Sequence, residues 1–130
     1  MDNIRVKELN GLALAYLGDA VWELRLREKF IVKNLKVKDL NKLVKAHVSA
    51  VAQSKIYLSI VDELEDEYRA CAKRARNSKI STFPKSCTMK EYKNATAFEA
   101  LIAMCYINKR EDIIEGIIEN YVFEKKNDEK

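Results

Sequence analysis

Two acidic residues stand in stretches of sequence that are otherwise apolar. Asp19 lies in the segment LGDAV at 17–21, and Glu99 lies in the segment AFEALI at 97–102. Acidic side chains are rarely buried unless they are paired or hold a cation. If the fold brings the two carboxylates together, they repel each other unless a cation joins them. Carboxylate oxygens suit Mg²⁺, which activates water and neutralises charge on a phosphate.

Spacing alone leaves two interpretations of this pair open, and it favours the first. In the first, arginine, lysine or backbone donors at helix ends satisfy each acid. In the second, the pair is a metal site for phosphodiester hydrolysis. A zinc site is not expected, because the chain has one histidine and its cysteines Cys71, Cys87 and Cys105 form no CxxC pair. The odd cysteine number favours reduced, cytosolic thiols.

The elements that must position these acids are helices. Among its 130 residues the chain has only three Gly and one Pro, which favours long helices over a turn-rich β-sandwich. Apolar residues recur at helical spacing over six ranges: 9–30, 38–48, 50–61, 63–76, 95–108 and 111–125. We expect one all-α domain over 1–130, with its core at about 9–125 and a polar tail at 126–130.

Local signals predict where some of these helices begin and where they touch. Ser49 is the expected N-cap of the third helix. Thr88 to Glu91 has the form of a capping box, which we assign to a short turn, and Asn94 is then the expected N-cap of the next helix. Gly18, inside the first helix, costs about 1 kcal/mol relative to Ala and indicates close approach of a backbone or a ligand.

Positive charge gathers in the middle of the chain. The net charge is only +4, but eight Lys or Arg residues stand against one acid between 69 and 93. A basic segment this local indicates a polyanionic partner, although a solvated basic helix end explains the charge equally well. The sequence predicts a loop over residues 77–87. The candidate phosphate contacts, with Asn77 as a neutral donor, are Lys73, Arg74, Arg76, Asn77, Lys79 and Lys85.

The sequences that flank the two acids resemble a known family. LALAYLGDAVWE at 12–23 resembles the signature of the ribonuclease III catalytic domain, and TAFEALI at 96–102 resembles its second acidic motif. Shorter segments agree in the same order: NGLALAY at 10–16, VSA at 48–50, KRARN at 73–77 and PK at 84–85. The resemblance runs from about 9 to 118 and is closest to the Mini-ribonuclease III group, which lacks a separate double-stranded-RNA-binding domain.

The resemblance implies a ribonuclease III-type helical bundle and a Mg²⁺-dependent endoribonuclease. Such an enzyme cleaves double-stranded RNA and leaves 5′-phosphate and 3′-hydroxyl ends. Asp19 matches the family's essential aspartate, and Glu99 matches its metal-binding glutamate. Two further acids of the standard enzyme are replaced here by Ala15 and Thr96, so the site is a reduced one. Glu23 follows Asp19 by one turn and has two interpretations, an outer-sphere contact to the metal or an ordinary exposed helix acid, of which the second is favoured.

The resemblance also implies partners. Tyr16 occupies the position where the family places an aromatic side chain at a dimer interface, and a two-fold homodimer presents one Asp19–Glu99 pair to each strand of a duplex. By analogy the substrate is a precursor of large-subunit ribosomal RNA in the cytoplasm, and an accessory ribosomal protein is a further candidate partner. No run of 18 apolar residues predicts a membrane span.

Two other functions stay open on the sequence. The changes at Ala15 and Thr96 motivate a catalytically silent RNA-binding or ribosome-associated protein on the same fold, whereas the presence of both Asp19 and Glu99 favours the enzyme. A plain helical interaction module leaves the basic segment and the two acids unexplained. We interpret His47, on a helix rich in Leu and Val, as a packed residue.

Overall fold

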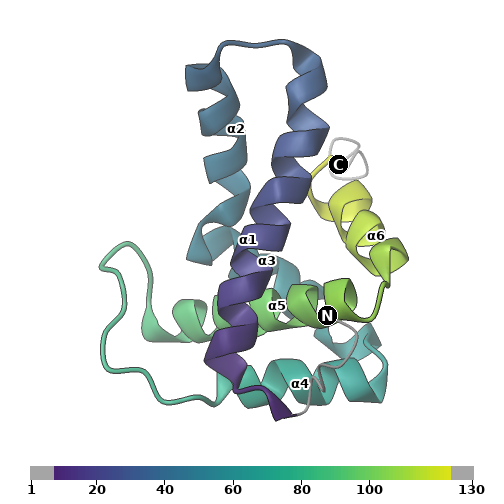
Figure 1. Ribbon diagram of the computed structural model, residues 1–130. Helices are drawn as coiled ribbons and strands as arrows, with labels where there is room; N and C mark the ends of the chain where they lie inside the picture. The colour runs from purple at the N-terminus through teal and green to yellow at the C-terminus, as the bar shows by residue number, and fades with distance from the viewer. Residues whose placement is uncertain (1–7, 124–130) are drawn as a thin grey trace.

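A computed structural model describes residues 8–123 of the chain (Figure 1). These residues form helices and contain no strand, which confirms the all-α fold class. The elements are α1 (Gly11–Phe30), η2 (Ile31–Lys33), α2 (Val37–Val48), α3 (Ala50–Ile60), η3 (Val61–Glu63), α4 (Asp66–Arg76), α5 (Met89–Ile107) and α6 (Glu111–Tyr121). No described helix is both long and apolar enough to cross a membrane.

Helix α5 is the central element of the bundle. It packs against α1, α3, α4 and α6, and Figure 1 shows α1 crossing it. Between Asn94 and Cys105 every side chain of α5 is buried except that of Glu99, which is half-buried. The one acid of this stretch therefore lies where the central helix comes closest to solvent.

The start of α5 differs from our prediction. Its first residue is Met89, and the capping box at Thr88 opens the helix itself: the Thr88 hydroxyl accepts from the Glu91 N–H at 3.0 Å, and the Glu91 carboxylate accepts from the Thr88 N–H at 2.9 Å. The predicted N-cap at Asn94 is wrong. Asn94 is buried inside the helix, where its amide joins neighbouring helices instead of capping a terminus.

Most other boundaries fall close to the predicted ranges. Ser49 caps α3 as predicted, because its hydroxyl accepts from the Ala52 N–H at 3.1 Å. The predicted helix 63–76 begins later, at Asp66. The Arg69 guanidinium donates to the carbonyls of Val61 and Leu64 and so stabilises a turn before α4. The last helix ends at Tyr121, and predicted positions 124–125 and the tail 126–130 lie outside the described residues.

Trp22 fixes the orientation of α1 in the bundle. Its side chain is fully buried and meets Phe98 of α5 edge to face, with ring centroids 4.8 Å apart. The indole N–H donates to the carbonyl of His47 at the end of α2, at 3.0 Å. Trp22 therefore holds α1 against both neighbours, three residues after Asp19.

Candidate active site

The helices α1 and α5 touch backbone to backbone at Gly18. A β-carbon built on Gly18 would lie 1.7 Å from the carbonyl oxygen of Glu99 and 2.6 Å from its carbonyl carbon. Glycine is the one residue that allows this approach, because it has no Cβ. The expectation that Gly18 permits close approach of another backbone is confirmed, and the contact brings Asp19 beside Glu99.

The carboxyl groups of Asp19 and Glu99 lie close enough across this contact to interact directly. Asp19 is exposed, whereas Glu99 is half-buried, so only Glu99 is enclosed by the apolar helices. Burial, together with the hydrogen bond to Asp19 and the repulsion between the two groups, raises the pKa of Glu99 to about 9. In the absence of a cation, Glu99 therefore keeps its proton at neutral pH.

Two carboxyl groups that share a proton fit a divalent cation, which favours ionisation of both groups. Within residues 8–123 no group of three or more His, Cys, Asp and Glu side chains is placed to hold a metal. The chain thus offers two carboxylates at this point, and water or phosphate oxygens would complete the coordination, as Mg²⁺ commonly accepts. Ala15 is buried, and the Thr96 hydroxyl donates to the Tyr92 carbonyl at 3.0 Å, so neither position adds a ligand.

Gln53 is a third polar side chain at this point, and the sequence reasoning missed it. It belongs to α3, is 1% exposed, and lies close enough to Glu99 to favour the ionised form of that carboxyl. Its Nε2 atom is buried without a hydrogen-bond partner. The available signal was a polar residue at an inward position of a mostly apolar helix.

Comparison with known proteins decides the family. The Ribonuclease III domain matches residues 12–110, a range that includes both Asp19 and Glu99. The chain belongs to the ribonuclease III domain family. A Mini-ribonuclease 3-like protein from Ilyobacter polytropus is 53% identical over 124 residues, covering 95% of this chain and 98% of that protein.

Two further relatives support membership of the Mini-ribonuclease III group. A Mini-ribonuclease 3 from Brevibacillus brevis is 38% identical over 111 residues, covering 85% of this chain and 83% of the relative. A crystal structure of a Fusobacterium nucleatum protein is 47% identical and superposes with a TM-score of 0.82, covering 87% of this chain and 91% of the other. The ribonuclease III-type fold expected from the resemblance is thereby confirmed.

The basic residues of this ribonuclease III domain lie at the end of α4 and on the loop before α5. Figure 1 shows that this loop extends beyond the ends of both helices. Five of the six predicted RNA contacts are exposed: Lys73, Arg74, Asn77, Lys79 and Lys85. Arg76 is half-buried, and its Nε donates to the Asn94 Oδ1 atom at 2.7 Å. The Nε atom of Arg76 is therefore already used in a hydrogen bond between α4 and α5.

The remaining predicted residues take different positions in the domain. Tyr16 is 85% exposed and shares one face of α1 with Leu12 and Leu24, which are also exposed. Glu23 forms an ion pair with Arg27 on the same helix. His47 is half-buried and stacks near Phe30, with ring centroids 6.0 Å apart, in agreement with a packed residue.

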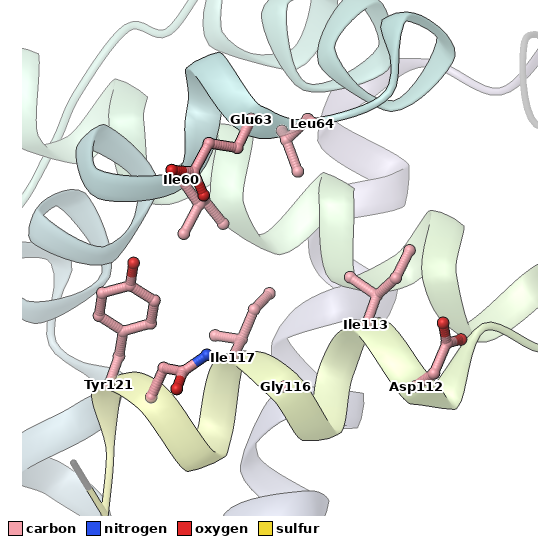
Figure 2. Close-up of a pocket in the computed structure, with 9 residues that line it drawn as sticks. Ile60, Glu63, Leu64, Asp112, Ile113, Gly116, Ile117 and Tyr121 are labelled. Atoms are coloured by element: carbon pink, nitrogen blue, oxygen red, sulfur yellow. The ribbon is translucent and has the colours of Figure 1, made fainter. Parts of the chain in front are cut away.

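A separate hollow of about 300 Å³ lies between α6 and the end of α3 (Figure 2). Ile60, Ile117 and Tyr121 lie around it, with Glu63 and Asp112 among its lining residues. Neither Asp19 nor Glu99 lines this hollow. The carboxylate pair at the α1–α5 crossing is therefore a distinct site in the ribonuclease III domain.

Proposed function

We propose that this protein is a Mg²⁺-dependent endoribonuclease that cleaves double-stranded RNA and leaves 5′-phosphate ends. The observation that carries the proposal is the meeting of the Asp19 and Glu99 carboxyl groups at the glycine contact between α1 and α5. Family membership supports a ribonuclease. The carboxylate pair supports a site on the catalytic domain at which a phosphodiester can be hydrolysed.

Asp19 and Glu99 would hold the metal ion. When bound, Mg²⁺ supplies the charge that activates water and offsets negative charge building up on the phosphate. Asp19 is exposed and so meets substrate and solvent first, while Glu99 is held below it by the buried surface of α5. Glu99 must release its proton to solvent before it can act as a ligand. No side chain has to attack the phosphate.

RNA affinity would come from the α4–α5 segment. Its exposed lysines and arginine can pair with phosphates on a duplex, which gives affinity that depends on salt and little on sequence. Asn77 adds a neutral donor at the end of α4. These contacts would set the position of the duplex over the carboxylate pair.

We further propose a homodimer in which Tyr16 is buried at the interface. Leu12, Tyr16 and Leu24 give α1 an exposed apolar face, which is the kind of surface that a second copy would cover. Two-fold symmetry would present one carboxylate pair to each antiparallel strand, so that a single binding event cuts both strands.

The natural substrate, by family resemblance, is a precursor of large-subunit ribosomal RNA. Such a substrate entails a cytoplasmic enzyme, and an accessory ribosomal protein is a candidate partner in presenting it. These assignments rest on the resemblance, while the exposed basic residues support RNA as the general class of partner.

One observation favours a second function, a catalytically silent RNA-binding protein. The described residues offer only two carboxylates where the standard ribonuclease III enzyme has four acids. Incubation with long duplex RNA, with Mg²⁺ or with EDTA, separates the two functions. The enzyme gives Mg²⁺-dependent fragments with 5′-phosphate ends, whereas the silent protein shifts the duplex in a gel and leaves it intact. Binding without cleavage at any Mg²⁺ concentration would contradict the proposed activity.

A further inference from the structure

The side-chain amide of Gln53 is buried, and its N–H donor is unpaired. Its side chain is 1% exposed, and its Nε2 atom has no hydrogen-bond partner. Buried polar atoms are nearly always paired, because an unpaired donor loses its bonds to water and gains nothing in return. A buried amide kept in this condition indicates a function beyond packing, and its position beside Glu99 shows where to look.

The placement of Gln53 is fixed by its neighbour in the sequence. The Ser54 hydroxyl accepts a hydrogen bond from the Asn94 side-chain amide at 3.0 Å, and both residues are buried. This bond pins α3 to α5 five residues before Glu99. With α3 held against α5 there, the Gln53 side chain and its unpaired Nε2 atom lie next to the Glu99 carboxyl.

We propose that Gln53 is a positioning residue of the metal site, whose side-chain N–H donates to the ionised Glu99 carboxylate and holds it turned toward Asp19. This inference rests on the proposed function and deepens it. A carboxylate has two oxygens with several acceptor positions, so Glu99 can accept from Gln53 and still face a cation.

A neutral donor suits this position better than a charged one would. An arginine or lysine beside Glu99 would form an ion pair with it and compete directly with the cation. An amide orients the carboxylate without neutralising its charge. Groups that orient metal ligands in this way commonly change metal affinity or activity by about 10- to 100-fold when they are removed.

The test compares Gln53→Met with Ser59→Ala in the full chain. Methionine is unbranched, has a similar length and fills the same space without an N–H. Mn²⁺ binding is measured by calorimetry, and urea unfolding is measured in EDTA. We expect Gln53→Met to weaken Mn²⁺ binding by about 10- to 100-fold. Its unfolding midpoint should not fall, because the lost amide had no partner in the metal-free protein.

Ser59→Ala is the matched control, because Ser59 is an exposed polar residue of the same helix whose hydroxyl donates only to the nearby Lys55 carbonyl, and its removal leaves Gln53 and the Ser54–Asn94 bond in place. We expect Mn²⁺ affinity to be unchanged in this variant. Equal Mn²⁺ affinity in Gln53→Met and the wild type would overturn the role of Gln53, and a lower midpoint in that case would show a purely structural amide. Failure of the wild type itself to bind Mn²⁺ would overturn the proposed metal site as well.

Gln53→Asn covers the case in which the methionine variant does not fold. Asparagine keeps the amide and shortens the side chain by one methylene group, so the N–H no longer reaches Glu99. We expect a folded protein with weakened Mn²⁺ binding, and wild-type affinity in this variant would contradict the positioning role.

Discussion

The α-carbon of Gly18 faces the carbonyl of Glu99 so closely that a β-carbon there would lie 1.7 Å from the carbonyl oxygen. Residue 18 therefore sets the distance between the two helices that carry the candidate catalytic acids. Asp19 follows the contact on α1, and Glu99 is itself the contact residue on α5. Any side chain at position 18 must push these helices apart, which separates the carboxyl groups and opens the core around Trp22.

Substitution of this glycine is expected to destabilise the fold. Gly18→Ala should lower the free energy of unfolding by about 3 kcal/mol or more, at the upper end of overpacking, because backbone atoms must move. Gly116→Ala is the control, since nothing lies within 4 Å of a Cβ at that helical position. It should raise stability by about 0.5–1 kcal/mol. Urea denaturation checks both, and a Gly18→Ala protein as stable as the wild type would contradict the close contact.

The Glu99 carboxyl should make the metal-free protein sensitive to alkaline pH. Its pKa is raised by burial and by Asp19 from 4.5 in the unfolded chain to about 9 in the folded one. The folded state then holds the proton more tightly, so this contribution to stability is complete below pH 4.5 and is lost as pH rises toward 9.

Glu99→Gln isolates this effect, because its amide does not titrate. In EDTA, the wild type should lose more unfolding free energy than Glu99→Gln between pH 6 and about pH 9, since only the wild type must take up a proton at residue 99 to fold in this range. Urea titrations at several pH values give the comparison. Parallel curves for the two proteins would show that Glu99 does not carry the shifted pKa.

The basic segment should control RNA affinity through charge. Arg74→Ala combined with Lys79→Ala should weaken duplex binding and reduce the slope of log K against log salt by about 1 per lost phosphate contact, because both side chains are exposed. Arg76 is unsuitable for this test, since it also bonds to Asn94. Binding is measured by fluorescence anisotropy over a range of salt concentrations.

A matched control for the basic segment is available at the far end of α5. Lys109 is exposed there with a φ of 60°, a conformation that asparagine tolerates. Lys109→Asn should leave both the affinity and the salt slope unchanged. If it weakens binding as much as the double variant does, the RNA surface is not confined to the α4–α5 segment.

Tyr16 should be essential for dimer formation. Tyr16→Asp places a charge on the apolar face of α1 and should convert a dimer into a monomer in sedimentation equilibrium. Leu58→Asp is the control, because Leu58 is also exposed but belongs to α3, and it should leave the dimer intact. A wild-type protein that sediments as a monomer at working concentration would remove the proposed dimer.

The sequence was informative where the type or spacing of a residue carries the signal by itself. Helical spacing predicted the helices, and Gly18 predicted a close backbone contact that the structure shows. It failed where the role depends on which side chain another helix supplies as the partner. Asparagine is a common N-cap residue, but Asn94 lies inside α5 and forms hydrogen bonds with Ser54 of α3 and Arg76 of α4. Gln53 was missed for the same reason, since its neighbour Glu99 is 46 positions away in the chain.

The exposure of Asp19 could not be predicted from the sequence either. An acid flanked by Gly18, Ala20 and Val21 suggests an enclosed side chain, yet Asp19 is exposed. Helix α1 crosses α5 at Gly18, and the next residue points past the edge of that contact. Only the packing of α1 against α5 decides whether the Asp19 side chain is enclosed between the helices or exposed to solvent.

The most direct test of the Asp19–Glu99 site is the rate at which excess enzyme cleaves duplex RNA in Mg²⁺. Asp19→Asn keeps the shape of the side chain and removes its charge, and Glu23→Gln is the control, because Glu23 lies one turn later and pairs with Arg27. We predict a fall of about 100-fold or more for Asp19→Asn, equivalent to about 3 kcal/mol or more of transition-state stabilisation, and a wild-type rate for Glu23→Gln. Cleavage by Asp19→Asn at the wild-type rate would contradict the assignment of this site.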